Sequence, residues 1–207
     1  MENSESVNAL LSVSPRSKVR LGSKRASYQR KDVYQLIDDT KLGHMAFIED
    51  GHPVVIPMTF WRKDDHLYFH SLNKSRLMKM IQAGKEVCIS FAQATEWVLS
   101  KSAFHTSVNY RSAVLYCSGK VVTDEAEFDE IFKGLFDQIE MGRWEQVRSP
   151  NKKERKATAL LKLNIDEGAF KSRTGGPNEE PEDLLLPVKS GTRAIGGCPF
   201  HHGVDNS

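Results

Sequence analysis

Residues 42–71 read LGHMAFIEDGHPVVIPMTFWRKDDHLYFHS and carry three strand signals in succession. Leu42–Glu49 leads into Asp50-Gly51, a pair that favours a tight hairpin turn. Pro53–Trp61 is expected to return as the second strand, and after another turn His66–Ser71 forms the third. Short strands joined by tight turns predict antiparallel sheet rather than the parallel sheet of a doubly wound fold.

Helical spacing of apolar residues recurs on both sides of this segment. A helix is expected over Arg30–Asp39, and a shorter one, capped by Asn73, is expected to end at Gly84. Asp124 starts the most amphipathic helix, whose apolar stripe down to Ile139 is expected to pack as core. The other expected elements are a polar helix over about residues 150–157 and strands over Val87–Ala92, Trp97–Lys101, Arg111–Thr123 and Ala159–Ile165. The sequence therefore predicts a mainly β antiparallel barrel or sandwich with helical covers.

Composition places the 207-residue chain among ordinary globular proteins, with 39% hydrophobic residues and 27% charged residues. The net charge of +2 gives no general argument for a nucleic-acid or membrane partner. Three cysteines cannot form a paired disulfide framework, and no apolar run approaches the roughly 20 residues of a membrane helix. No secretory signal is recognised at the N-terminus, so a reduced, cytoplasmic protein is expected.

The chain is expected to divide into three parts. Residues 1–27 are polar and basic and are interpreted as a flexible arm, residues 28–188 as the folded domain, and residues 189–207 as an irregular tail. No G-x-G-x-x-G or P-loop pattern is present, so a nucleotide site of either kind is not expected. No paired carboxylates, Ser-His-Asp order or zinc spacing indicates another enzyme class, and no catalytic acid or base is predicted.

The segment from Ser71 to Lys79 is the clearest candidate for anion binding. A strand is expected to end at Ser71 and a helix to open soon after it, with Arg76 and Lys79 on one helical face. Amides at a helix start, together with basic side chains, suit a terminal phosphate. Basic residues on a short helix are also commonly no more than solvated, so both interpretations stay open.

Several stretches, taken in order, resemble one known family. They are GHMAF (43–47), HPVVIPM (52–58), LYFHS (67–71), SRLMK (75–79), SAFHTSVNYRS (102–112), KATA (156–159) and KSRTG (171–175). Together the chain resembles the pyridoxamine 5'-phosphate oxidase-related FMN-binding family, and within it the branch of nitroimidazole-resistance-type flavoproteins. The resemblance implies an antiparallel split β-barrel, acting as a homodimer, with FMN at each end of the subunit interface.

The resemblance also implies the site residues. A first group would line the flavin ring, the ribityl chain and the phosphate, and a second group would supply the other face, from the partner subunit. The first group is Ile56, Pro57, Met58, Thr59, His70, Ser71, Ser75, Arg76 and Lys79, and the second is Ser107, Asn109, Tyr110 and Arg111. Trp144 and Arg173 match positions common in this branch, the former as a packing anchor and the latter near the substrate side.

The expected activity is an FMN-dependent oxidoreductase that passes electrons from reduced flavin to a small-molecule acceptor. The arginine and tryptophan arrangement of close pyridoxamine 5'-phosphate oxidases is missing, so oxidation of a B6 vitamer is not transferred. Two alternatives stay open. One is a haem-binding or haem-degrading split barrel that uses Cys198, His201 and His202 as ligands. The other is a flavin-binding sensor or carrier without turnover.

Overall fold

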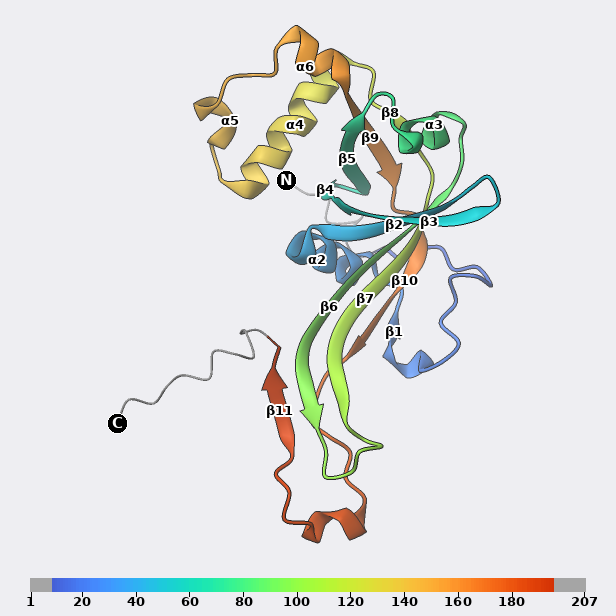
Figure 1. The fold of residues 1–207 in the computed structure, drawn as a ribbon, viewed down its shortest axis with the longest axis vertical. Coiled ribbons are helices and arrows are strands. Elements are labelled where there is room, and N and C mark those ends of the chain that lie inside the picture. Colours follow the sequence, from blue (N-terminus) through green and yellow to red (C-terminus); the bar gives the residue numbers. More distant parts are fainter. Residues whose placement is uncertain (1–8, 196–207) are drawn as a thin grey trace.

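The computed structural model describes residues 9–195, which form two antiparallel sheets covered by helices (Figure 1). The larger sheet has the strand order β1-β10-β7-β6-β2-β3, and β11 also pairs with β6. The smaller sheet has the order β4-β5-β9-β8. The larger sheet consists of β1 (Ala26–Ser27), β2 (Leu42–Glu49), β3 (His52–Thr59), β6 (Val87–Leu99), β7 (Ser107–Cys117), β10 (Glu167–Arg173) and β11 (Gly191–Ala194). The smaller sheet consists of β4 (Trp61–Lys63), β5 (His66–Leu72), β8 (Gly119–Val121) and β9 (Thr158–Asn164).

The predicted hairpin of β2 and β3 is confirmed, but the return strand is shorter than expected. It ends at Thr59, and β4 then begins the other sheet at Trp61. Phe60 lies at the crossing, fully buried, with its ring edge-on to Phe69 at 5.7 Å and to Phe91 at 5.4 Å between centroids. The strand divides because burial of this ring in the main core takes the chain out of one sheet and into the next.

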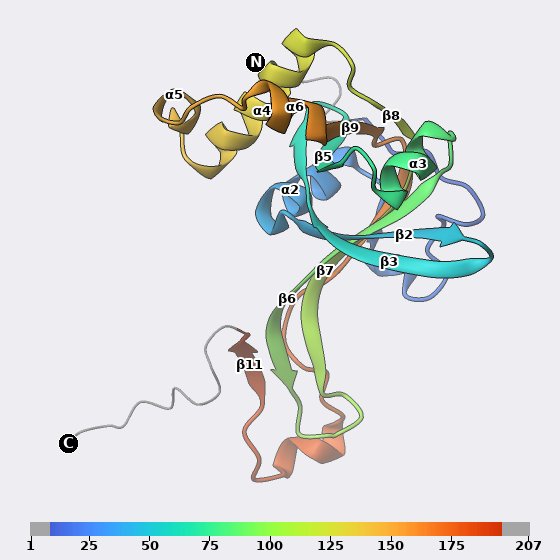
Figure 2. The ribbon, with the colours of Figure 1, turned by 45° about the horizontal axis from the view of Figure 1, so that its top comes forward.

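The region expected to hold two strands, Val87–Ala92 and Trp97–Lys101, is the single 13-residue strand β6, with a bulge between Ala94 and Glu96. Figures 1 and 2 show that one end of the long strands β6 and β7 projects beyond the rest of the larger sheet as an arm. The 3-10 helix η2 (Pro181–Leu185) lies at the far end of this arm, and β11 returns along β6. The expectation of irregular structure from residue 189 is therefore wrong for Gly191–Ala194, because these residues pair with Glu96–Leu99.

Two helices, α2 and α3, pack near the sheets, and only α3 has a side-chain cap at its start. α2 (Arg30–Thr40) buries Val33, Leu36 and Ile37, as predicted. α3 (Arg76–Gln82) is capped by Ser75, whose hydroxyl accepts a hydrogen bond from the Met78 amide at 3.1 Å. The prediction of Asn73 as the cap is wrong, because its side-chain amide is bonded to the Lys156 carbonyl.

The helices on the other side of the smaller sheet are α4 (Glu125–Ile139), α5 (Arg143–Gln146) and α6 (Lys152–Ala157). Asp124 caps α4 as predicted, accepting from the Glu127 amide at 2.8 Å. Phe128 and Ile131 are buried and Phe132 and Leu135 pack against the same cluster, but Ile139 is 71% exposed, so the apolar stripe packs as core except at its C-terminal end. None of the helices in residues 9–195 is long and apolar enough to cross a membrane.

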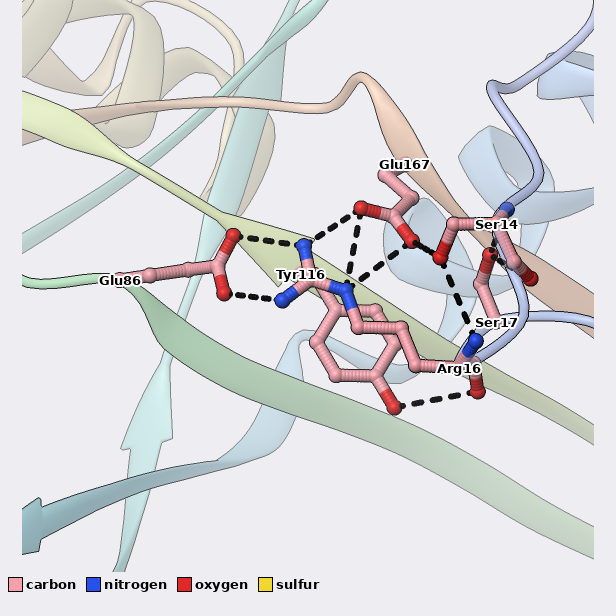
Figure 3. Close-up of polar contacts among 6 residues, drawn as sticks. All are labelled: Ser14, Arg16, Ser17, Glu86, Tyr116 and Glu167. Carbon is pink, nitrogen blue, oxygen red and sulfur yellow. Dashed lines mark hydrogen bonds and ion pairs between the residues drawn. The ribbon is translucent and has the colours of Figure 1, made fainter.

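The described part of the N-terminal arm, residues 9–27, is largely exposed but is anchored to the folded domain at a few points. Leu11 is 3% exposed, and its amide donates to the Tyr28 carbonyl at 2.8 Å. Arg16 bonds to Glu86 and Glu167, and its guanidinium lies over the ring of Tyr116, 4.3 Å from the centroid (Figure 3). Hydrogen bonds from Arg16 and then Ser14 lower the pKa of Glu167 to about 2. These contacts tie residues 11–17 to β7 and β10, and the flexibility expected of the N-terminal arm stays a prediction.

Candidate functional site

A cavity of about 410 Å³ lies between the edge strand β3, the end of β5 and the start of α3. A volume of this size lies within the usual range of small-molecule sites. The cavity brings together every predicted residue of the first group except Lys79. Its lining residues are Ile56, Pro57, Met58, Thr59, His70, Ser71, Ser75, Arg76 and Leu77. Leu77 was not predicted as a site residue, because an apolar residue at helical spacing does not distinguish a cavity wall from core.

Strand β3 pairs only with β2, so its other backbone edge is open to the cavity. The hairpin pairs Glu49 with His52 across a two-residue turn. In an antiparallel ladder counted from that pair, His52, Val54, Ile56 and Met58 point their amides toward β2. Pro53 and Pro57 fall in the alternate positions, where the missing N–H costs no ladder bond. The amides that face the open edge are therefore those of Val55 and Thr59.

The alternating direction of the amides limits which residues of β3 can donate a backbone hydrogen bond to a ligand. The resemblance places residues 56–59 along the flavin, but Ile56 and Met58 direct their amides to Met45 and Gly43. The open edge near Pro57 presents its own carbonyl and the Thr59 amide. A ligand beside this strand can therefore receive a hydrogen bond from Thr59 and donate one to Pro57, a complementary pair of contacts for a ring amide.

The polar end of the cavity is formed where β5 gives way to α3. The Ser71 hydroxyl donates to the Ser75 hydroxyl at 2.9 Å. Arg76 is half-exposed, and its guanidinium reaches Glu49 at 3.1 Å. This pair is a surface ion pair, so the guanidinium is held near the cavity at little energetic cost and stays available to an anion. Lys79 is exposed on α3 and does not line the cavity.

His70 borders the same cavity from β5. Its ring lies 5.8 Å from that of Phe132 and 6.2 Å from that of Trp61, measured between centroids. Partial desolvation lowers the pKa of His70 below its ordinary value, although the side chain stays open to solvent on one side. The imidazole is therefore neutral near pH 7, with one nitrogen able to donate and the other to accept.

The second predicted group lies on β7 in the arm and does not line this cavity within one protomer. Asn109 is 1% exposed; its amide donates to Glu96 Oε2 at 2.8 Å and to the Gly175 carbonyl at 3.0 Å, and its oxygen accepts from Arg173. Arg111 donates to Asp39 at 2.7 Å and lowers the pKa of that carboxyl. Neither Glu96 nor Gly175 was predicted as a site residue, although Gly175 lies in the KSRTG stretch that carries the family resemblance.

The remaining predicted residues have different outcomes. Trp144 packs edge-on against Phe136, with ring centroids 5.3 Å apart, in agreement with a packing role. Cys198, His201 and His202 lie outside the described residues. Within residues 9–195, no cluster of three or more histidine, cysteine, aspartate or glutamate side chains could hold a metal ion.

Comparison with known proteins identifies the family of this chain. The family described as pyridoxamine 5'-phosphate oxidase matches residues 29–172. A flavocytochrome, Anf3 from Azotobacter vinelandii, is 30% identical with a TM-score of 0.82, over 94% of this chain and 92% of that one. A protein from Mycobacterium smegmatis described as binding FAD and haem is 29% identical with a TM-score of 0.76, over 84% of this chain and 87% of that one.

A third structure shows the fold alone. A putative 5-nitroimidazole antibiotic resistance protein from Bacteroides thetaiotaomicron is 18% identical with a TM-score of 0.61, over 83% of this chain and 90% of that one. No curated protein matches the sequence. The predicted fold class, an antiparallel split β-barrel with helical covers, is confirmed, although the sheets of residues 9–195 do not close into one continuous barrel.

Proposed function

This chain belongs to the pyridoxamine 5'-phosphate oxidase family, and we propose that it is a flavin-dependent oxidoreductase that binds its cofactor between β3, β5 and α3. The observation that carries the proposal is the cavity itself, which unites eight residues named in advance from the family pattern. FMN was the cofactor expected from the sequence, and the similar Mycobacterium smegmatis protein is described as binding FAD. The proposal therefore covers both flavin nucleotides.

The residues present suit a flavin nucleotide. The open edge at Pro57 and Thr59 can pair with the polar rim of a flat ring, and the partly buried Ile56 and Met58 give β3 an apolar face. Ser71, Ser75 and Arg76 supply hydroxyl and guanidinium donors for a phosphate at the other end. When bound, the flavin would supply hydride and electron transfer, and these residues would position it and set its surroundings.

We further propose that a second copy of the chain completes the site with Ser107, Asn109, Tyr110 and Arg111. In one protomer these residues lie along the arm, away from the lining of the first cavity. The arm exposes large apolar side chains, among them Phe104 at 88% and Leu185 at 92%. Exposed apolar groups gathered on a projecting element are typical of a contact surface, which here would bring the arm of one protomer to the partner.

Replacing Arg76 with glutamine is expected to weaken flavin binding by roughly tenfold or more, because a charge-assisted contact to the phosphate is lost. Fluorescence quenching of free FMN on titration with protein measures the affinity. Arg148→Gln is the matched control, since Arg148 is also an exposed arginine paired with a glutamate, Glu154, but lies outside the cavity. Equal affinities for native protein and Arg76→Gln would remove the phosphate assignment.

A second candidate, haem binding, is favoured by the two similar structures at 30% and 29% identity, described as a flavocytochrome and as an FAD and haem binding protein. Among the described residues, His70 offers a neutral imidazole beside the cavity, the form that ligates iron. Haem added to the native protein should then give a Soret band that His70→Ala abolishes. Loss of the band in a Cys198, His201 and His202 triple variant, with His70 intact, would place the ligand in the C-terminal segment instead.

A further inference from the structure

A second, larger cavity of about 560 Å³ lies at the β1 and β10 end of the larger sheet, the end opposite β3 in the strand order. The proposed function does not use this cavity. It lies between the 3-10 helix η1 (Ser23–Arg25) with β1, the end of β10 and the loop that follows β10. The residues that matter for its chemistry are Lys24, Arg25, Ser27, Asp32, Arg173 and Asn178. None of its lining residues is shared with the flavin cavity.

The lining carries three cationic side chains against one carboxylate, so it has a net positive charge. Lys24, Arg25 and Arg173 make no ion pair with any carboxylate in the described part of the chain. Asp32 is the single carboxylate of the lining, and its oxygen accepts a hydrogen bond from the Ser27 hydroxyl. Three cations around one cavity repel one another, so an anionic ligand between them would relieve an unfavourable arrangement.

Arg173 is oriented before any ligand arrives. Its guanidinium donates to the side-chain oxygen of Asn109 and to the carbonyls of Gly175 and Gly176, at 3.4 and 3.2 Å. All three acceptors are neutral, so they fix the direction of the guanidinium without cancelling its charge. Gly175 has a φ of +103°, a conformation that favours glycine and turns the loop so that its carbonyl meets Arg173.

We propose that this cavity binds the phosphate groups of a nucleotide. Unpaired arginine and lysine side chains with a pre-oriented fork are suited to phosphate oxygens, and the volume exceeds what a single phosphate needs. Through Arg173 and Asn109 the cavity adjoins the second group of the flavin site. Two sources share the required chemistry: the adenylate half of a flavin dinucleotide and a separate nucleotide electron donor. Assigning the cavity to either of these two sources rests on the proposed flavin function. The binding of a nucleotide phosphate in the cavity does not rest on it.

Calorimetric titration with ADP tests the phosphate site without any flavin or nicotinamide. The double variant Lys24→Gln and Arg25→Gln is expected to bind ADP roughly tenfold more weakly or worse, because two exposed cations are removed without breaking an ion pair. The matched control is Lys152→Gln and Lys153→Gln, which removes the same charge from α6, outside the cavity. No ADP binding by the native protein, an equal loss in the control, or inorganic phosphate binding as tight as ADP would overturn the proposal.

The two sources are then separated with the same double variant. Weaker affinity for FAD with unchanged affinity for FMN assigns the cavity to the adenylate half of the cofactor. A raised KM for NADPH in flavin reduction, with FAD affinity unchanged, assigns it to the electron donor. A native protein that binds ADP but neither flavin keeps this site and removes the proposed function, whereas one that binds flavin but not ADP does the reverse.

Discussion

Gly119→Ala is expected to destabilise the protein by about 3 kcal/mol or more, a large fraction of the roughly 5–15 kcal/mol that stabilises a typical domain. A Cβ at Gly119 would lie 2.1 Å from the carbonyl oxygen of Lys162 and 2.8 Å from the Cα of Leu163. Both atoms belong to the backbone of β9, which pairs with β8 at this point. Neither can move without opening the ladder, so the clash cannot be relieved by a side-chain rotation.

Gly134→Ala is the control for the same chemical change. Gly134 lies inside α4, and an added Cβ would meet no atom within 4 Å. Alanine there should stabilise the protein by roughly 0.5–1 kcal/mol, because a helical interior disfavours glycine. Urea unfolding of both variants gives the two free energies of unfolding. Similar stability changes in the two variants would mean that β8 and β9 are not packed as closely as described.

Asn109→Leu is expected to lower the free energy of unfolding by about 3 kcal/mol, although leucine has nearly the same shape. The asparagine is buried and links Glu96, Arg173 and the Gly175 carbonyl. Leucine offers neither donor nor acceptor, so the carboxylate and the guanidinium would each lose a partner at this partly buried site. The loss of stability should concentrate in the projecting arm of β6 and β7, because β7, β10 and the loop that follows β10 meet at Asn109.

The comparison variant for this change is Asn164→Leu, at an exposed asparagine at the end of β9. A surface substitution of this kind should change stability by no more than about 0.5 kcal/mol. Thermal unfolding and flavin affinity are measured on both variants. If Asn109→Leu keeps native stability, the hydrogen-bond network of the arm does not contribute as described. If it is destabilised but binds flavin as tightly as native protein, the second group does not belong to the site.

The elements predicted well from sequence are those specified by local chemistry. Asp50-Gly51 fixes a two-residue turn, so the boundaries of β2 follow directly from the alternation before it. The helix cap at Asp124 is likewise a local arrangement. The cap of α3 was misplaced from Ser75 to Asn73 because both residue types suit an N-cap, and only a distant carbonyl, that of Lys156, draws the asparagine away.

The elements missed were those fixed by contacts far apart in sequence. The polar stretch in the middle of β6 resembles a break, but pairing with β7 and with β11 keeps it extended. Likewise, the described part of the N-terminal arm is anchored at Arg16 by Glu86 and Glu167, at separations of 70 and 151 residues. Basic composition alone favours a solvated segment, because it contains no information about where the carboxylate partners lie.

The residues that line the cavity were named from the family pattern, but their backbone geometry was not. The family pattern named the lining at Ile56, Pro57, Met58 and Thr59, and the cavity contains all four. The direction of each amide depends on the hairpin register, which becomes definite only with the pairing of Glu49 and His52. The basic cavity around Arg173 was not predicted, because Lys24 and Arg25 lie about 150 residues away from it in the sequence.

The central claim is that this chain holds a flavin nucleotide between β3, β5 and α3. Its most direct test is a visible absorption titration of flavin-free protein with FMN and with FAD, followed by denaturation to quantify the released flavin. We predict a shifted and better-resolved flavin envelope that saturates at about one flavin per protomer for at least one of the two. An absorption spectrum identical to that of free flavin at every protein concentration, for both nucleotides, would rule out the proposed flavin site.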